Sequence, residues 1–258
     1  VWFNATDSVL KFQYTETAGT WASSANLNTA RFGLAGVGAQ TTALVFNGSP
    51  ATGATELYNG TSWTEKNDMG TTNRYDLKGA GTPSAALGFA GGTAPTGQLN
   101  ELWNGTNWTE VADLNTEHRN KPFGGGTSTA AICAGGFAPP GYNVNTETWN
   151  GTSWSEVNNL NSGRVGIGSA AYGTNTAGLA FGGEGGPSKA ITELWNGTNW
   201  TEVNDLNSAR SQLGGAGIST SGVAFGGENA SPSAKTQTTE SWNGTSWTTV
   251  ANMVGSAR

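Results

Sequence analysis

One short phrase recurs along this chain and constrains its fold more than any other feature. It is clearest from Glu193 to Val203, where the sequence reads Glu-Leu-Trp-Asn-Gly-Thr-Asn-Trp-Thr-Glu-Val. Other copies span Glu101–Val111, Glu147–Val157, Glu56–Glu65 and Glu240–Val250, and a degenerate one surrounds Trp21. In each clear copy, alternating apolar and polar residues flank an Asn-Gly pair. That pair favours a type I′ turn, so the phrase predicts a β-hairpin with aromatic residues on both strands.

The phrase returns at a nearly constant interval. Its second tryptophan falls at Trp21, Trp63, Trp108, Trp154, Trp200 and Trp247, so successive intervals are 42, 45, 46, 46 and 47 residues. A Gly-rich double run precedes each hairpin, and in the last unit we expect four strands at residues 212–218, 222–225, 238–242 and 246–252. Four short strands at this period are typical of a β-propeller blade, and no segment shows a helical period.

The order of residues within each unit resembles the kelch repeat. An arginine follows each tryptophan by ten or eleven residues, at Arg31, Arg74, Arg119, Arg164, Arg210 and Arg258. A strand of small residues, an apolar pair before Gly-Gly, and the aromatic hairpin come next. The WD repeat would need Gly-His and Trp-Asp signatures, and a sialidase Asp box would need Asp where these units have Asn. The resemblance covers essentially the whole chain and implies an all-β, kelch-like propeller with four-stranded antiparallel blades.

Counting the units predicts six blades in one domain spanning residues 1–258. Residues 1–30 would supply three strands of a partial blade, and five full repeats would span residues 31–73, 74–118, 119–163, 164–209 and 210–258. A continuation beyond Arg258 would add the missing inner strand and close the ring without an exposed edge. The chain begins with Val1 rather than Met, which favours a fragment of a longer protein.

The repeated large and charged residues are expected to be structural. The tryptophans at positions 21, 63, 108, 154, 200 and 247 would fill the space between blades. A glutamate begins each phrase, at Glu56, Glu101, Glu147, Glu193 and Glu240, with Glu16 as a further candidate. These glutamates and the arginines could form one ion pair per blade or a charged ring around an anion. Their matched numbers favour the ion pairs, because paired charges leave little net field.

Composition argues against several functional classes. The net charge is −6 and Lys and Arg are not clustered, so we expect neither nucleic-acid binding nor a membrane-surface patch. No apolar stretch is long enough to span a membrane. A single cysteine, Cys133, and a single histidine, His118, exclude an intrachain disulfide, a Cys/His metal site and the Cys–Tyr and histidine set of kelch-type copper oxidases. The repeated carboxylates match in position from unit to unit, whereas an active site breaks repeat symmetry. We therefore predict no enzyme, metal or cofactor.

Binding is expected where the units differ, in the loops between their second and third strands, here called the B–C loops. Variable loops on a rigid scaffold are common binding sites. The candidate ligand-binding residues are Thr96, Gln98, Phe137, Tyr142, Asn143, Lys189, Asn229 and Lys235. Simple solvated connections are the alternative for any one loop. The Asn-x-Thr sequences, such as Asn104-Gly-Thr106, fit N-glycosylation, but the hairpin turn already requires Asn-Gly.

A second resemblance bears on biological setting. Residues 1–11, Val-Trp-Phe-Asn-Ala-Thr-Asp-Ser-Val-Leu-Lys, resemble a segment that leads into the repeat domains of tailed-phage fibre and appendage proteins. This resemblance implies a virion-surface or extracellular protein whose partners are a host-surface glycan or protein, other virion proteins, or copies of itself. A secreted or surface bacterial adhesion module and a glycan-active enzyme are the alternatives.

Overall fold

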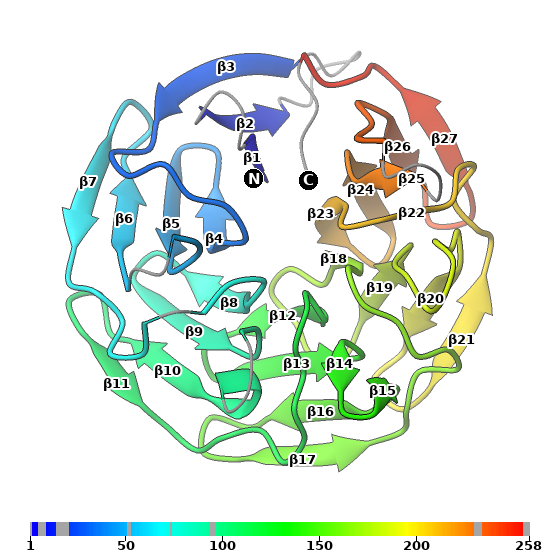
Figure 1. Ribbon diagram of the computed structural model, residues 1–258, viewed down its shortest axis with the longest axis horizontal. Coiled ribbons are helices and arrows are strands. Elements are labelled where there is room, and N and C mark those ends of the chain that lie inside the picture. Colours follow the sequence, from blue (N-terminus) through cyan, green and yellow to red (C-terminus); the bar gives the residue numbers. More distant parts are fainter. Residues whose placement is uncertain are drawn as a thin grey trace.

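Antiparallel sheets stand side by side around one axis and form a wheel (Figure 1). The computed structural model describes residues 2–4, 9–13, 21–50, 53–72, 74–92, 96–229 and 234–254, with the backbone alone for 2–4 and 9–13. Among the described residues, the only helix is the 3-10 turn η1 (Thr96–Gln98), and none is long and apolar enough to cross a membrane. The protein is thus an all-β propeller, as predicted.

Five sheets have four strands each, ordered from the axis to the rim (Figure 1). Blade 1 contains β4 (Ala35–Ala39), β5 (Thr42–Phe46), β6 (Thr55–Tyr58) and β7 (Trp63–Lys66). Blade 2 contains β8 (Lys78–Thr82), β9 (Ala85–Phe89), β10 (Asn100–Trp103) and β11 (Trp108–Glu110). Blade 3 contains β12 (Phe123–Thr127), β13 (Ala130–Ala134), β16 (Thr146–Trp149) and β17 (Trp154–Val157). Blade 4 contains β18 (Gly168–Ala170), β19 (Gly178–Phe181), β20 (Thr192–Trp195) and β21 (Trp200–Val203). Blade 5 contains β23 (Gly214–Ile218), β24 (Ser221–Phe225), β26 (Thr239–Trp242) and β27 (Trp247–Val250).

The prediction of six four-stranded blades is wrong. Among the described residues, the sheet between blades 5 and 1 has three strands, β1 (Trp2–Asn4), β2 (Val9–Gln13) and β3 (Trp21–Asn26), and we call it the N-terminal sheet. These strands lie where the sequence predicted three strands of a partial blade. The fourth strand was expected to follow Arg258, and residues 255–258 lie outside the described part of the chain.

Each outer hairpin forms where it was predicted, but its turn is not the type I′ turn that the sequence suggested. In blade 4, Trp195 on β20 pairs directly with Trp200 on β21, so four residues, 196–199, connect the strands, and positive φ occurs at Gly197 but not at Asn196. Gly197 has φ of 92°, a left-handed value that glycine adopts without steric cost. The Asn196 side-chain oxygen accepts hydrogen bonds from the backbone N–H groups of Thr198 and Asn199. The Asn-Gly pair is therefore explained by turn geometry.

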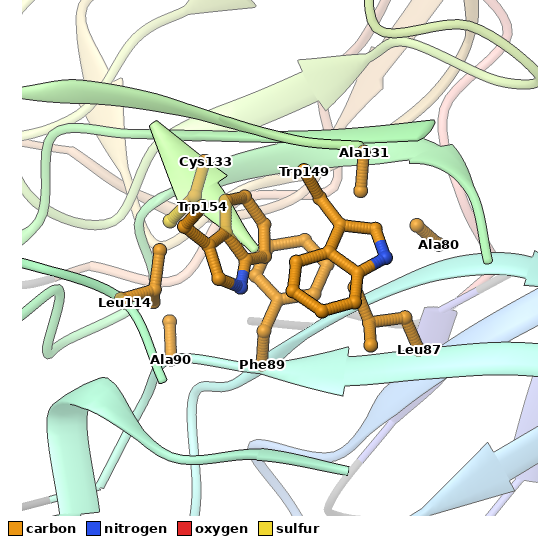
Figure 2. Packing of buried hydrophobic residues seen from close by; sticks show 9 residues of the cluster. All are labelled: Ala80, Leu87, Phe89, Ala90, Leu114, Ala131, Cys133, Trp149 and Trp154. Carbon is orange, nitrogen blue, oxygen red and sulfur yellow. The ribbon is translucent and has the colours of Figure 1, made fainter. Parts of the chain in front are cut away.

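The core lies between the blades, as a repeated contact between a phenylalanine and a tryptophan of the next blade. Phe89 of blade 2 packs on Trp154 of blade 3 with ring centroids 5.2 Å apart, within a buried cluster that Figure 2 shows from close by. Equivalent pairs are Phe46–Trp108, Phe123–Trp200, Phe181–Trp247 and Phe225–Trp21. The last pair joins blade 5 to the N-terminal sheet, so the aromatic contacts continue between the first and last parts of the chain.

Glycines on the inner strands allow these rings to approach. A Cβ atom on Gly79 would lie 2.9 Å from the Phe46 ring of the preceding blade, and one on Gly215 would lie 2.6 Å from the Phe181 ring. Real Cβ atoms do not approach other atoms so closely. The inner strands are rich in glycine because each lies flat against an aromatic ring of its neighbour.

Blade 3 provides the same ring from a different strand. In the other blades the phenylalanine ends the second strand, whereas Ala134 ends it here. Phe123 on β12 pairs directly with Ala134, so the ring has moved to the cross-strand partner on the same face of the sheet. The ring position between blades is thereby conserved although the sequence position is not.

Candidate functional site

The repeated glutamates are buried and bind neighbouring elements. In blade 4, Glu193 lies 2.8 Å from the Arg164 guanidinium and accepts hydrogen bonds from the backbone and side-chain nitrogens of Asn161. Both charged side chains are fully buried. Asn161 belongs to the connection from blade 3, so the glutamate ties two consecutive blades together. We call each such group of glutamate, its cation and the connecting backbone a latch.

Latches of this kind recur around the wheel. The other ion pairs are Arg31–Glu56 at 3.0 Å, Arg74–Glu101 at 3.6 Å and Arg210–Glu240 at 2.5 Å. Burial lowers the pKa of Arg74 to about 10, against the opposing effect of Glu101. These charges satisfy one another inside the protein, and none faces solvent as part of a charged ring.

The third latch uses His118 in place of the expected Arg119. His118 Nε2 lies 3.3 Å from Glu147, and Nδ1 lies 2.6 Å from the Gly135 carbonyl oxygen. Two acceptors require both ring nitrogens to carry protons, so the imidazole is charged. Burial alone lowers its pKa, but the neighbouring Cys133, Glu147 and Gly135 outweigh burial and raise the pKa to about 10. Arg119 instead pairs with Glu117 nearer the surface.

Sequence reasoning missed the asparagine of the latches, although a signal was present. A Leu-Asn pair recurs just before the cation at Leu27-Asn28, Leu114-Asn115, Leu160-Asn161 and Leu206-Asn207. The leucine is buried, and each asparagine backbone N–H donates to the glutamate of the blade that follows. Spacing from the same leucine would also have identified His118. It follows Leu114 by four residues, the interval from Leu206 to Arg210.

The B–C loops lie on the face of the wheel where the blade-to-blade connections also run. Each loop is tied to the connection of its own blade: Phe137 exchanges backbone hydrogen bonds with Arg119, and Asn229 pairs with Arg210. Two small sheets result, β14 (Phe137–Ala138) with β15 (Gly141–Tyr142) and β22 (Arg210–Ser211) with β25 (Glu228–Asn229). The described parts of these two loops are therefore held to the blade-to-blade connections.

The candidate loop residues divide into two groups. Asn143 is buried and donates to the Glu117 carbonyl, and Gln98 donates to the carbonyls of Leu114 and Asn115, so both support the fold. Tyr142 is 42% exposed and its hydroxyl lies 3.3 Å from the Glu184 carboxylate.

The other candidate residues differ in their exposure to solvent. Lys235 is exposed, whereas Thr96, Phe137, Lys189 and Asn229 are partly buried. Phe137, Tyr142 and Asn143 lie together in the B–C loop of blade 3, and the other candidates come from blades 2, 4 and 5. Their role in binding stays a prediction.

A second feature of this face was not predicted, namely a cavity of about 910 Å³ on the axis of the wheel. The innermost strands of all five blades line it, largely with glycine and alanine. Near its loop-side mouth lie the polar side chains of Asp76, Lys121, Gln212 and Glu228, and deeper in the wall are Lys78 and Ser169.

The mouth of the cavity is formed by residues in a left-handed conformation. Equivalent positions in blades 1 to 5 are Gly33, Asp76, Lys121 with Asn120, Gly166 and Gln212, all with φ between 57° and 63°. Backbone hydrogen bonds join them in sequence around the axis, from Asp76 to Gly33, Lys121 to Asp76, Gly166 to Asn120 and Gln212 to Gly166. We call this ring of linked residues the collar. Two glycines show that the conformation needs no side chain, yet the other positions carry polar ones.

Comparison with known proteins bears on the fold alone. No known protein family matches the chain, and no curated protein matches it either. A solved structure of YjhT has a similar fold. It is 12% identical to this chain and superimposes with a TM-score of 0.68, over 89% of this chain and 86% of that one. At this identity the likeness supports the propeller architecture and carries no residue roles across.

The side chains at the loop face and the cavity mouth can be compared with what metal binding and ligand contact require. No three described His, Cys, Asp or Glu side chains lie close enough together to hold a metal ion. The glutamates that recur in every blade are occupied in the latches. Exposed aromatic rings, amides and lysines remain at the loop face and the cavity mouth, where they can stack on a ligand and hydrogen-bond to it.

Proposed function

We propose that this protein is a non-catalytic, kelch-like binding propeller that attaches to a glycan through the face carrying the B–C loops and the cavity mouth. The observation that carries the proposal is the placement of irregular residues. The glutamates, cations and aromatic residues that repeat from blade to blade are buried in latches and aromatic contacts, whereas the B–C loops, which differ in sequence, all lie on this one face. The blades therefore differ from one another at a surface that a ligand could reach.

Two exposed aromatic residues give this face the chemistry of sugar recognition. Phe32 is 46% exposed at the rim of the cavity, and Tyr142 is 42% exposed in a B–C loop. Such rings offer flat apolar surface at low entropic cost, and the tyrosine hydroxyl adds a polar contact. The setting we propose is a virion-surface or fibre domain that binds a host cell. A secreted bacterial adhesion module would use the same face.

A glycan array with matched aromatic variants tests this proposal. Phe32→Ala and Tyr142→Ala should each weaken binding to the glycans retained by the unaltered protein. Tyr172→Ala is the control, because Tyr172 is 55% exposed but lies after β18 at the opposite mouth of the cavity. Binding that is lost in the Tyr172 variant and kept in the other two would place the site on the wrong face. No binding to any glycan, or release of a cleaved product, would reject the function itself.

A further inference from the structure

Two lysines enter the axial cavity at positions where a lysine is unusual. Lys78 begins the inner strand of blade 2, and the corresponding residues of blades 1, 4 and 5 are Ala35, Gly168 and Gly214. Each pairs across the strand with the last residue of the neighbouring strand, as Lys78 does with Phe89. A long cationic side chain at this one inner position has no counterpart in those blades, so the repeat itself does not explain it.

Lys78 is built into the wall in a specific way. Its stem passes over Gly124 of blade 3, where an added Cβ would lie 2.8 Å from the Lys78 Cβ. The ammonium group then reaches blade 4, where Nζ lies 3.4 Å from both the Ile167 carbonyl oxygen and the Ser169 hydroxyl. Both distances are at the long limit of hydrogen bonding, and an ammonium group has three donors. The ammonium group of Lys78 is therefore held in place by hydrogen bonds that are long and weak.

Lys121 also lines the cavity and places a second cation near Lys78. It belongs to the collar, and its Nζ donates to the Gln212 carbonyl oxygen of blade 5 at 2.8 Å. Its backbone carbonyl accepts from Ile167 N–H, and the carbonyl of Ile167 is the group that Lys78 approaches. The two amines thus converge on adjacent parts of blades 4 and 5 from blades 2 and 3.

The electrostatics agree with this convergence. Burial first, and then the charge of Lys121, lower the pKa of Lys78 to about 7, although Asp76 and Cys133 oppose the change. An anion placed beside the two amines would relieve both the desolvation and the repulsion. Such a site gains more from a bound anion than an exposed lysine does, because the interaction is less screened by water.

We propose that the axial cavity binds the anionic group of an acidic sugar, a carboxylate or a sulfate, between Nζ of Lys78, Nζ of Lys121 and the hydroxyl of Ser169. The cavity volume of about 910 Å³ lies within the range of about 300–1,000 Å³ common for small-molecule sites, so it can admit the sugar ring with its anion. This inference rests on the proposed function and names the ligand class for the same face.

The decisive experiment compares glucuronate with glucose by isothermal titration calorimetry, with sodium sulfate as a competitor. Glucuronate should bind, glucose should bind at least tenfold more weakly, and sulfate should displace glucuronate. Lys78→Met should weaken glucuronate binding at least tenfold. Lys66→Met, which removes an exposed lysine on the rim strand β7, should not change it. Direct binding of sulfate in a titration where glucuronate does not bind would assign the site to sulfated ligands.

A second measurement covers the case in which Lys78→Met fails to fold. Reductive ¹³C-methylation of the unaltered protein gives each lysine a separate NMR signal, and the Lys78 signal should shift on adding glucuronate or sulfate. Equal binding of glucose and glucuronate, or a Lys78 signal that neither anion moves, would overturn the anionic site. The glycan array could still succeed in that case through neutral glycans on the aromatic residues, so the two proposals fail separately.

Discussion

Replacing Glu193 with glutamine tests whether the latches hold neighbouring blades together. Its carboxylate lies 2.8 Å from Arg164 and accepts two hydrogen bonds from Asn161, also at 2.8 Å. Glutamine keeps the shape but leaves the fully buried guanidinium without a counter-charge. Breaking a buried ion pair in this way costs about 3–5 kcal/mol of unfolding free energy. For a chain of this size, about 2–4 °C per kcal/mol predicts a melting temperature lower by about 6–20 °C.

Urea denaturation followed by tryptophan fluorescence measures the effect, with Glu202→Gln as the matched control. Glu202 lies directly across from Glu193 on β21 but is exposed, so its replacement should change stability by no more than about 0.5 kcal/mol. The double variant Arg164→Met with Glu193→Met should recover much of the loss, because no isolated charge stays buried. If Glu193→Gln were no more destabilising than Glu202→Gln, the latches would contribute nothing and our reasoning about them would be wrong.

Three further predictions follow from the packing and the hydrogen bonds. Because the pKa of His118 is raised, the stability that its charge contributes is fully present below about pH 6.5 and is lost as pH rises through about 10. The midpoint of urea denaturation, measured from pH 6 to pH 10.5, should therefore fall more for the unaltered protein than for His118→Arg. Thr192→Val leaves the Trp247 indole N–H, now 3.0 Å from the Thr192 hydroxyl, without an acceptor, and should cost about 1–3 kcal/mol in the same assay. Gly215→Ala forces a Cβ into the preceding blade and should cost about 1–3 kcal/mol, whereas Gly141→Ala meets nothing within 4 Å and should be close to neutral in thermal melts.

The fold was largely predictable because its strongest signals are local. Asn-Gly between alternating strands specifies a hairpin whatever surrounds it, and five copies at one period specify a ring of blades. Strands predicted at residues 212–218, 222–225, 238–242 and 246–252 appear as β23, β24, β26 and β27, with their ends moved by at most two residues. The number of complete blades was not predictable in this way, because it depends on which strands share one sheet.

Blade 3 shows where reasoning from aligned repeats stops working. Its expected cation was Arg119, but His118 forms the ion pair. The ring between blades comes from Phe123, across the ladder from Ala134, where the other blades have their phenylalanine. The ion pair is formed by the preceding residue in the chain, and the aromatic ring comes from the cross-strand partner. A cross-strand exchange leaves no trace in a repeat alignment, because the two positions are distant in sequence and adjacent only in the folded sheet.

The cavity was missed for a related reason, and its collar now gives the best argument that it has a use. Left-handed backbone is unfavourable for residues with a side chain, and glycine avoids the cost, as Gly33 and Gly166 do in blades 1 and 4. Asp76, Lys121 and Gln212 adopt the same conformation and project polar groups at the mouth of the cavity. Glycine would adopt this backbone conformation without strain. The presence of polar side chains at these positions therefore indicates a role other than maintaining the fold. Because these polar groups lie at the mouth of the cavity, we infer that the benefit is ligand recognition at the axis.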